Sequence, residues 1–76
     1  MTDSALLQKK IKEKGVKLGF LVKKLNTSYH WLNKKINNEK DFTASEIDIL
    51  CEVLGITDLK EKDRIFFAKN VEKSST

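Results

Sequence analysis

The side chains best suited to hydrogen-bond a polar partner are concentrated in one short stretch, residues 28–37. It contains the chain's single histidine, His30, together with Asn33, Lys34 and Asn37. Imidazole, carboxamide and ammonium groups can read the edge of a base or hold a phosphate. Catalysis and metal binding have less support, because the chain has one histidine, one cysteine (Cys51) and no cluster of either. We therefore expect a binding protein with no catalytic activity, metal or cofactor.

A helical wheel places these polar side chains on one face. At about 100° per residue, Leu32 and Ile36 point within about 40° of each other and define a buried side. Lys34 then falls opposite them, with the histidine and the two asparagines nearby, and this face contains no acidic residue. A short helix with a cationic, amide-bearing outer face is typical of proteins that insert a helix into the DNA major groove.

Two aromatic residues stand on either side of His30. Tyr29 lies within about 40° of the buried direction, so packing is favoured over base contact. For Trp31, packing against the preceding helix is likewise favoured over contact with a thymine methyl group. Cys51 lies on an apolar stripe and is interpreted as a buried small apolar residue.

Helical spacing of apolar residues recurs along the chain and predicts an all-α domain, because the period-two alternation of strands is absent. Gly15 and Asn26 suit the left-handed conformation that ends a helix. Thr43 and Glu46 fit a capping box, and Gly55 ends the helix that follows. The predicted helices lie at about 4–14, 17–25, 29–37 and 44–54, with a fifth that starts after Asp58 and includes Phe66 and Phe67.

The length of 76 residues allows one domain, and a single cysteine excludes an internal disulfide. Residues 1–40 carry ten lysines and three acids, a net +7, whereas residues 41–76 carry five bases and eight acids, a net −3. This separation into a basic and an acidic half suits a domain that orients itself on a polyanion. The chain lacks a signal peptide or membrane span, so we expect a cytoplasmic location with no membrane partner. One domain is predicted over 1–70, followed by a polar, frayed tail at 71–76.

The segment 18–37 and its surroundings resemble the Cro and phage-repressor helix-turn-helix family, often called the Xre family. The resemblance covers roughly residues 7–56. It implies a compact five-helix domain of the phage-repressor type with a helix-turn-helix at about 18–37. The segments that carry it are 15–16, 21–22, the turn 26–28, the apolar pair at 32 and 36, and 42–47 through 54–56.

The resemblance and the helical wheel converge on the same face. In that family the base-reading positions fall at the start and along the outside of the second motif helix. The matching positions here are Ser28, Tyr29, His30, Asn33 and Lys34. The expected phosphate contacts are Lys17, Lys23, Lys35, Asn37 and Asn38.

Three residues depart from the family pattern. Leu18 stands where the family usually has a glutamine that contacts a phosphate and braces the reading helix. Val22 replaces a usual alanine, and Asn26 replaces a usual glycine. None of the three is expected to disrupt the fold, but Leu18 removes one expected DNA contact.

Ile49 and Val53 form a second apolar pair at four-residue spacing. Two interpretations remain open for them. The fifth helix can cover them, or they form the seam of a two-fold dimer, which repressors of this type often use. The dimer candidates are Ile49, Val53, Phe66 and Phe67.

The resulting prediction is a homodimeric, repressor-like regulator that binds a double-stranded DNA operator. The resemblance alone places it in a phage or mobile element. The alternative is a helix-turn-helix interaction module that binds a repressor or another regulatory protein without operator binding.

Overall fold

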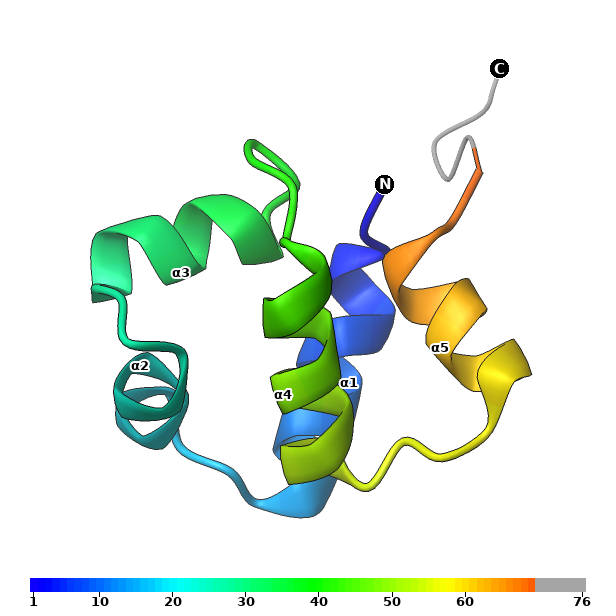
Figure 1. Cartoon of the computed structure of the whole chain (residues 1–76), viewed down its shortest axis with the longest axis horizontal. Coiled ribbons are helices and arrows are strands. Elements are labelled where there is room, and N and C mark those ends of the chain that lie inside the picture. Colours follow the sequence, from blue (N-terminus) through cyan, green and yellow to red (C-terminus); the bar gives the residue numbers. More distant parts are fainter. Residues whose placement is uncertain (70–76) are drawn as a thin grey trace.

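The computed structural model describes residues 1–69, and this part of the chain contains five helices and no strand (Figure 1). The all-α prediction is therefore confirmed. The predicted tail, residues 71–76, lies outside the described residues. The helices are α1 (Ser4–Lys14), α2 (Leu18–Leu25), α3 (Tyr29–Ile36), α4 (Ala44–Leu54) and α5 (Leu59–Phe66).

The helix ends follow from local sequence signals. Gly15 and Asn26 adopt positive φ values of 68° and 52° and end α1 and α2, as predicted. Ser28 caps α3, where its Oγ accepts a hydrogen bond from the Trp31 N–H at 3.2 Å. By contrast, α2 starts at Leu18, one residue later than predicted, and its N-cap Lys17 makes no side-chain capping bond.

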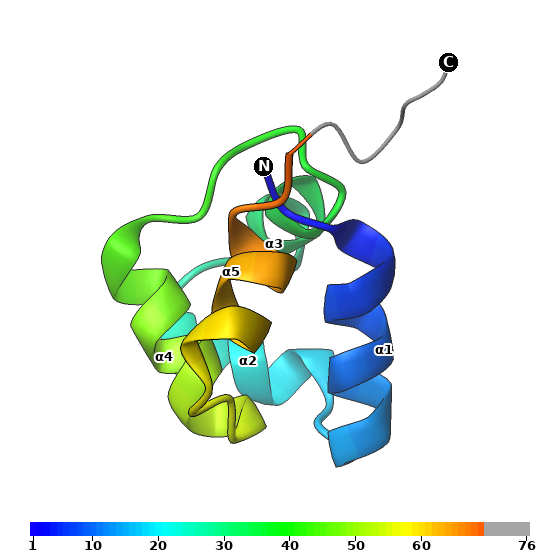
Figure 2. The same ribbon diagram turned by 90° about the vertical axis from the view of Figure 1, so that its right-hand side faces the viewer.

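The helices are arranged with α1 and α4 through the centre of the molecule (Figure 1). On one side of this pair lie α2 and α3, and on the other side lies α5, as the perpendicular view also shows (Figure 2). No helix within residues 1–69 has the length and apolar character needed to cross a bilayer. This arrangement leaves the outer faces of α2 and α3 open to a partner.

The core is apolar and draws on all five helices. Leu32 and Ile36 are 1% and 4% exposed, which confirms the buried side assigned to the third helix. Phe42 and Phe66 meet edge to face at 5.9 Å between ring centroids, a favourable geometry for two aromatic rings. The buried apolar residues are Leu7, Ile11, Leu21, Leu25, Leu32, Ile36, Phe42, Ile47, Leu50, Leu54, Ile56, Ile65 and Phe66.

The N-terminal segment fastens α5 to the rest of the domain, a feature the sequence did not indicate. The Asp3 N–H donates to the Ile65 carbonyl at 2.7 Å, and the Ala68 N–H donates to the Met1 carbonyl at 2.8 Å. Between these two bonds Thr2 is buried, and its N–H donates to Oδ1 of Asn38 at 3.0 Å. The segment thus joins the end of α5 to the loop after α3.

Candidate nucleic-acid interface

The outer side of α3 carries the reading face, which we define as His30, Asn33, Lys34 and Asn37. Three of these side chains are exposed and Lys34 is partly exposed, while Leu32 and Ile36 fill the opposite side. Lys34 Nζ lies 3.4 Å from Oε1 of Glu39, an exposed pair that contributes little. The reading face therefore offers an imidazole, an ammonium group and two carboxamides to solvent.

The two aromatic residues of this helix are only partly packed. Tyr29 is 55% exposed and Trp31 is 43% exposed, so neither ring belongs to the buried core, and the packing favoured for them is not confirmed. The Trp31 ring lies beside His30, with 5.5 Å between centroids, and beneath the Lys40 ammonium at 5.0 Å. An ammonium group at this distance from an indole face is attracted by the ring quadrupole. Both rings therefore remain available at the surface next to the reading face.

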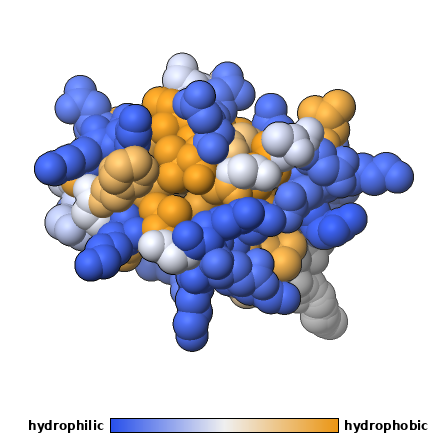
Figure 3. Space-filling model, turned by 90° about the horizontal axis from the view of Figure 1, so that it is seen from below, coloured by the Kyte–Doolittle hydropathy of each residue, from blue (hydrophilic) through white to orange (hydrophobic). Residues whose placement is uncertain are grey.

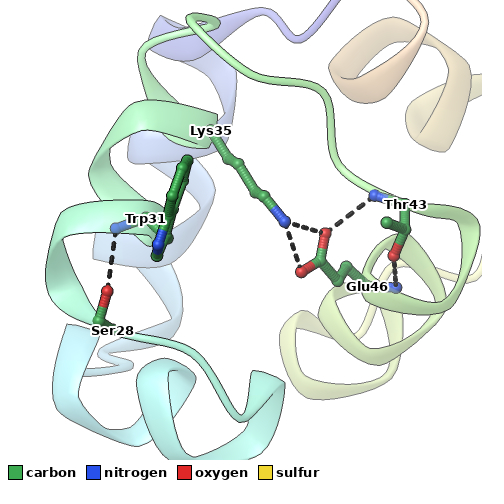
Figure 4. A network of polar contacts seen from close by, with 5 residues as sticks. All are labelled: Ser28, Trp31, Lys35, Thr43 and Glu46. Atoms are coloured by element: carbon green, nitrogen blue, oxygen red, sulfur yellow. Dashed lines mark hydrogen bonds and ion pairs between the residues drawn. The ribbon is translucent and has the colours of Figure 1, made fainter.

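Lys35 does not point freely toward solvent, and its predicted role as a phosphate contact is corrected by the structure. Its Nζ lies 2.7 Å from both carboxylate oxygens of Glu46, at the first turn of α4 (Figure 4). The same carboxylate accepts the Thr43 N–H at 2.9 Å and completes the predicted capping box. Both charged side chains are about 15% exposed. Lys35 therefore fastens α3 to α4.

The electrostatics of Glu46 follow from this contact. Burial alone would raise the pKa of Glu46, but the hydrogen bonds from Lys35 and from Thr43 outweigh it, and the pKa lies below its ordinary value of 4.5. A carboxyl group whose pKa is lower in the folded than in the unfolded state stabilises the fold above the unfolded pKa. That contribution is lost as the pH falls through the folded pKa.

Replacing Glu46 with glutamine should lower the free energy of unfolding at pH 7 by about 1–3 kcal/mol, because the buried Lys35 loses its charged partner. The variant should also lose less stability than the wild type between about pH 5 and pH 2, since it has no carboxyl group to protonate. Urea unfolding at the two pH values measures both effects. An equal loss in the two proteins would contradict the role given to the ion pair.

Two of the predicted phosphate-binding lysines are available to contact a DNA backbone. Lys17 and Lys23 are exposed and form no ion pair with any residue between 1 and 69. They lie in a stretch without acidic residues that runs from Lys14 to Asn38. This acid-free stretch contains all of α2 and α3, so the positive potential is concentrated on the side of the reading face.

The two asparagines after α3 have different surroundings. Asn37 caps the C-terminus of α3 and stays exposed. Asn38 takes a left-handed conformation, with φ at 65°, and its Oδ1 is occupied by the Thr2 N–H. This bond occupies only the oxygen of the side chain, and a phosphate would accept from the Nδ2 amide group, so phosphate contact by Asn38 stays a prediction.

A groove beside the reading face lies between α1 and α3, and sequence reasoning missed it. The groove has a volume of about 280 Å³, and Leu18 contributes to its apolar wall. Lys12 of α1 lines the same groove as Asn33 and Asn37 of the reading face. No local signal could reveal this, because the contact depends on how α1 packs against α3. The lining residues are Gln8, Ile11, Lys12, Leu18, Asn33, Ile36 and Asn37.

The four dimer candidates separate into core and surface residues. Phe66 is 4% exposed and packs on Phe42, so its assignment to a dimer seam was wrong. Phe67 is 52% exposed. Ile49 and Val53 are half-buried against the core, so α5 does not cover them completely.

Comparison with known proteins gives one finding on the family of this chain. A family model described as the Cro/C1-type HTH DNA-binding domain matches residues 7–61. The match spans more than two thirds of the chain and includes all of α2, α3 and α4. Neither the curated proteins nor the solved structures gave a match.

Proposed function

The chain belongs to the Cro/C1-type HTH DNA-binding domain family, and from this premise we propose that it is a sequence-specific repressor that reads double-stranded DNA with α3. The observation that carries the proposal is the reading face. It presents His30, Asn33, Lys34 and Asn37 to solvent within an acid-free stretch of 25 residues, Lys14 to Asn38.

Base recognition is assigned to the reading helix and its first turn. Asn33 can form two hydrogen bonds to an adenine, and Lys34 can donate to O6 and N7 of a guanine. His30 and Ser28 each have a group that can donate or accept, and Tyr29 stands half-exposed beside them. These five residues are proposed to supply the sequence preference.

Phosphate contacts fix the position of α3 in the major groove of the DNA. Lys17 and Lys23 extend from the start and the end of α2, and Asn37 lies at the C-terminus of α3. Lys12, on the rim of the groove between α1 and α3, joins this set in place of Lys35. Such contacts hold DNA of any sequence and make the affinity dependent on salt.

Salt titration of DNA binding tests the proposal directly. Affinity for a preferred site should fall steeply as salt rises, because lysines that bind phosphates displace counterions. It should also exceed the affinity for random DNA by at least about 10³-fold at physiological salt. Binding that shows no sequence preference at any salt concentration would contradict a repressor that reads bases.

We propose that the protein acts as a homodimer with its two reading helices about one turn of DNA apart. Ile49, Val53 and Phe67 supply half-exposed apolar surface on α4 and at the end of α5. A two-fold seam would bury this surface and match the symmetry of a palindromic operator. Dimer formation would raise the affinity for paired half-sites through effective concentration.

Replacing Ile49 with lysine should leave the helical circular dichroism intact and give a monomer in sedimentation, because a charge is placed in the proposed seam. Glu13→Lys on α1 changes an exposed residue to lysine elsewhere and should keep the oligomeric state of the wild type. An Ile49→Lys protein that sediments like the wild type would place the seam on another surface. An unfolded Ile49→Lys protein would assign Ile49 to the core.

A second candidate function is an interaction module that binds another regulator without an operator. Leu18, which replaces the usual phosphate-binding glutamine, and the exposed Tyr29 and Trp31 favour it. The two candidates differ in one measurable property, because only the repressor enriches a sequence motif from random DNA. The regulated gene of the repressor would belong to a phage or mobile element by family analogy alone.

A further inference from the structure

An exposed groove on α2 combines aromatic and basic side chains in a way that DNA binding does not require. It has a volume of about 560 Å³, and Phe20, Val22 and Tyr29 provide its apolar surface. Lys17 and Lys23 flank these residues. We call it the α2–α3 groove, lined by Lys17, Gly19, Phe20, Val22, Lys23 and Tyr29.

Glycine at position 19 creates the shape of this groove. A Cβ atom there would lie 2.8 Å from the phenolic oxygen of Tyr29, closer than real Cβ contacts allow. A side chain at position 19 would therefore make the hydroxyl end of Tyr29 move away from the first turn of α2. Phe20, the next residue, is 48% exposed, and the Lys24 ammonium lies 5.6 Å from its ring centroid.

Figure 3 shows the molecule from below, the side on which α2 and the C-terminal ends of α1 and α4 lie. Apolar surface gathers left of centre, toward α2, and hydrophilic side chains surround it. Exposed apolar surface rimmed by charge is typical of a site that binds a protein segment. A DNA backbone would gain little from Phe20, because phosphates interact with donors and cations rather than with an aromatic ring.

From this combination we propose that the α2–α3 groove binds an acidic segment of a partner protein that carries a large apolar side chain. Charge complementarity selects this occupant. Lys17 and Lys23 line the groove, and Lys24 lies over the Phe20 ring. All three form no ion pair within residues 1–69 and lie in the acid-free stretch. The apolar side chain would pack on Phe20 and Tyr29, and the flanking carboxylates would meet the lysines.

The segment would also compete with DNA, a consequence that rests on the proposed function. Lys17, Lys23 and Tyr29 belong both to the groove and to the proposed DNA interface. A partner that occupies these residues would prevent the two lysines from contacting the DNA phosphates. Such competition would give this small domain a means of release from DNA by an acidic protein.

A random peptide library displayed on phage and selected against the full chain, without DNA, tests the docking site. The enriched peptides should pair aspartate or glutamate with a large apolar residue. The best peptide should bind Phe20→Ala at least about tenfold more weakly, as expected for an aromatic anchor. Leu59→Ala, which removes a 72% exposed leucine from α5, is the matched control and should bind within about twofold of the wild type.

Further measurements separate docking from DNA binding. Lys23→Glu should weaken peptide binding strongly in low salt and much less in high salt, because salt screens the charge. The loss in Phe20→Ala should change little with salt, because the lost contact is apolar. Circular dichroism checks that both variants are folded. No enrichment, peptides without acidic residues, or binding that survives Phe20→Ala would overturn the docking site, as would displacement of the peptide by a second copy of the chain.

The competition step has its own readout. The selected peptide should displace a DNA duplex from the wild-type protein and should fail to do so from Phe20→Ala, which is expected to bind DNA normally. A peptide that binds at Phe20 and leaves DNA in place would overturn competition. Failure of the protein to bind any DNA would contradict the proposed function, whereas the peptide measurements would still test the groove.

Discussion

Replacing Lys34 with alanine should weaken binding to the preferred DNA site by about 1–3 kcal/mol, or about 5- to 150-fold, and relax the preference at one base pair. Lys34 is at the centre of the reading face, opposite Leu32 and Ile36. Its contact with Glu39 is exposed and 3.4 Å long, so the lysine can leave it for a base at little cost. Binding curves on the preferred site and on its single-base variants measure the effect.

Lys23→Ala is the matched control for this loss. Lys23 is proposed to contact a phosphate, so its removal should weaken binding to all sequences alike and reduce the salt slope by about one. Lys34→Ala should lower the ratio of specific to random binding, whereas Lys23→Ala should not. Equal losses on every sequence for Lys34→Ala would show that Lys34 is only a phosphate contact.

Replacing Phe66 with alanine should destabilise the fold by about 3–5 kcal/mol, because it removes a buried ring and leaves a cavity beside Phe42. For a domain of this size, a loss of 3 kcal/mol lowers the Tm by at least about 12 °C. The next residue provides the control, since Phe67 has the same side chain but is 52% exposed. At a protein concentration low enough for the proposed dimer to dissociate, Phe67→Ala should change the stability by less than about 0.5 kcal/mol.

Thermal unfolding of the two variants tests whether α5 belongs to the domain core. A small effect of Phe66→Ala would mean that α5 packs loosely and that the domain ends near the match at residue 61. A large effect of Phe67→Ala would place that ring in a contact, either within the core or across a dimer seam. Sedimentation at the same concentrations separates these two cases.

Features of the fold that depend on neighbours in sequence were predictable. Gly15 and Asn26 end helices because each tolerates a positive φ, and Thr43 begins one because its hydroxyl and Glu46 satisfy free N–H groups. The buried side of α3 follows from the four-residue spacing of Leu32 and Ile36. A helix surrounded by such signals has its exposed face determined before any tertiary contact forms.

Features that depend on tertiary packing were not predictable in the same way. Lys35 is one residue from Lys34, yet its contact with Glu46 depends on where α4 begins relative to α3. At the C-terminal end of α5, the adjacent Phe66 and Phe67 differ in exposure, and only the packed structure shows that Phe66 is the buried one. Nothing in the sequence shows that the Thr2 N–H reaches Oδ1 of Asn38.

The structure shows which of the basic side chains are held in ion pairs. The sequence shows a basic and an acidic half, but not which lysines are free. Four lysines form ion pairs within residues 1–69, namely Lys10, Lys34, Lys35 and Lys62. Lys17 and Lys23 are not among them, and they lie on the helix that precedes the reading helix in the motif. Part of the unpaired positive charge therefore lies on the helix next to α3 in the sequence.

Selection from a random pool of double-stranded DNA tests the central claim most directly, namely that α3 reads bases. The full chain should enrich a motif with two half-sites about one helical turn apart, and Lys34→Ala should change the preferred base at a single position of each half-site. A pool that stays unenriched after selection with the folded wild-type protein would contradict base reading by α3 and favour the interaction module.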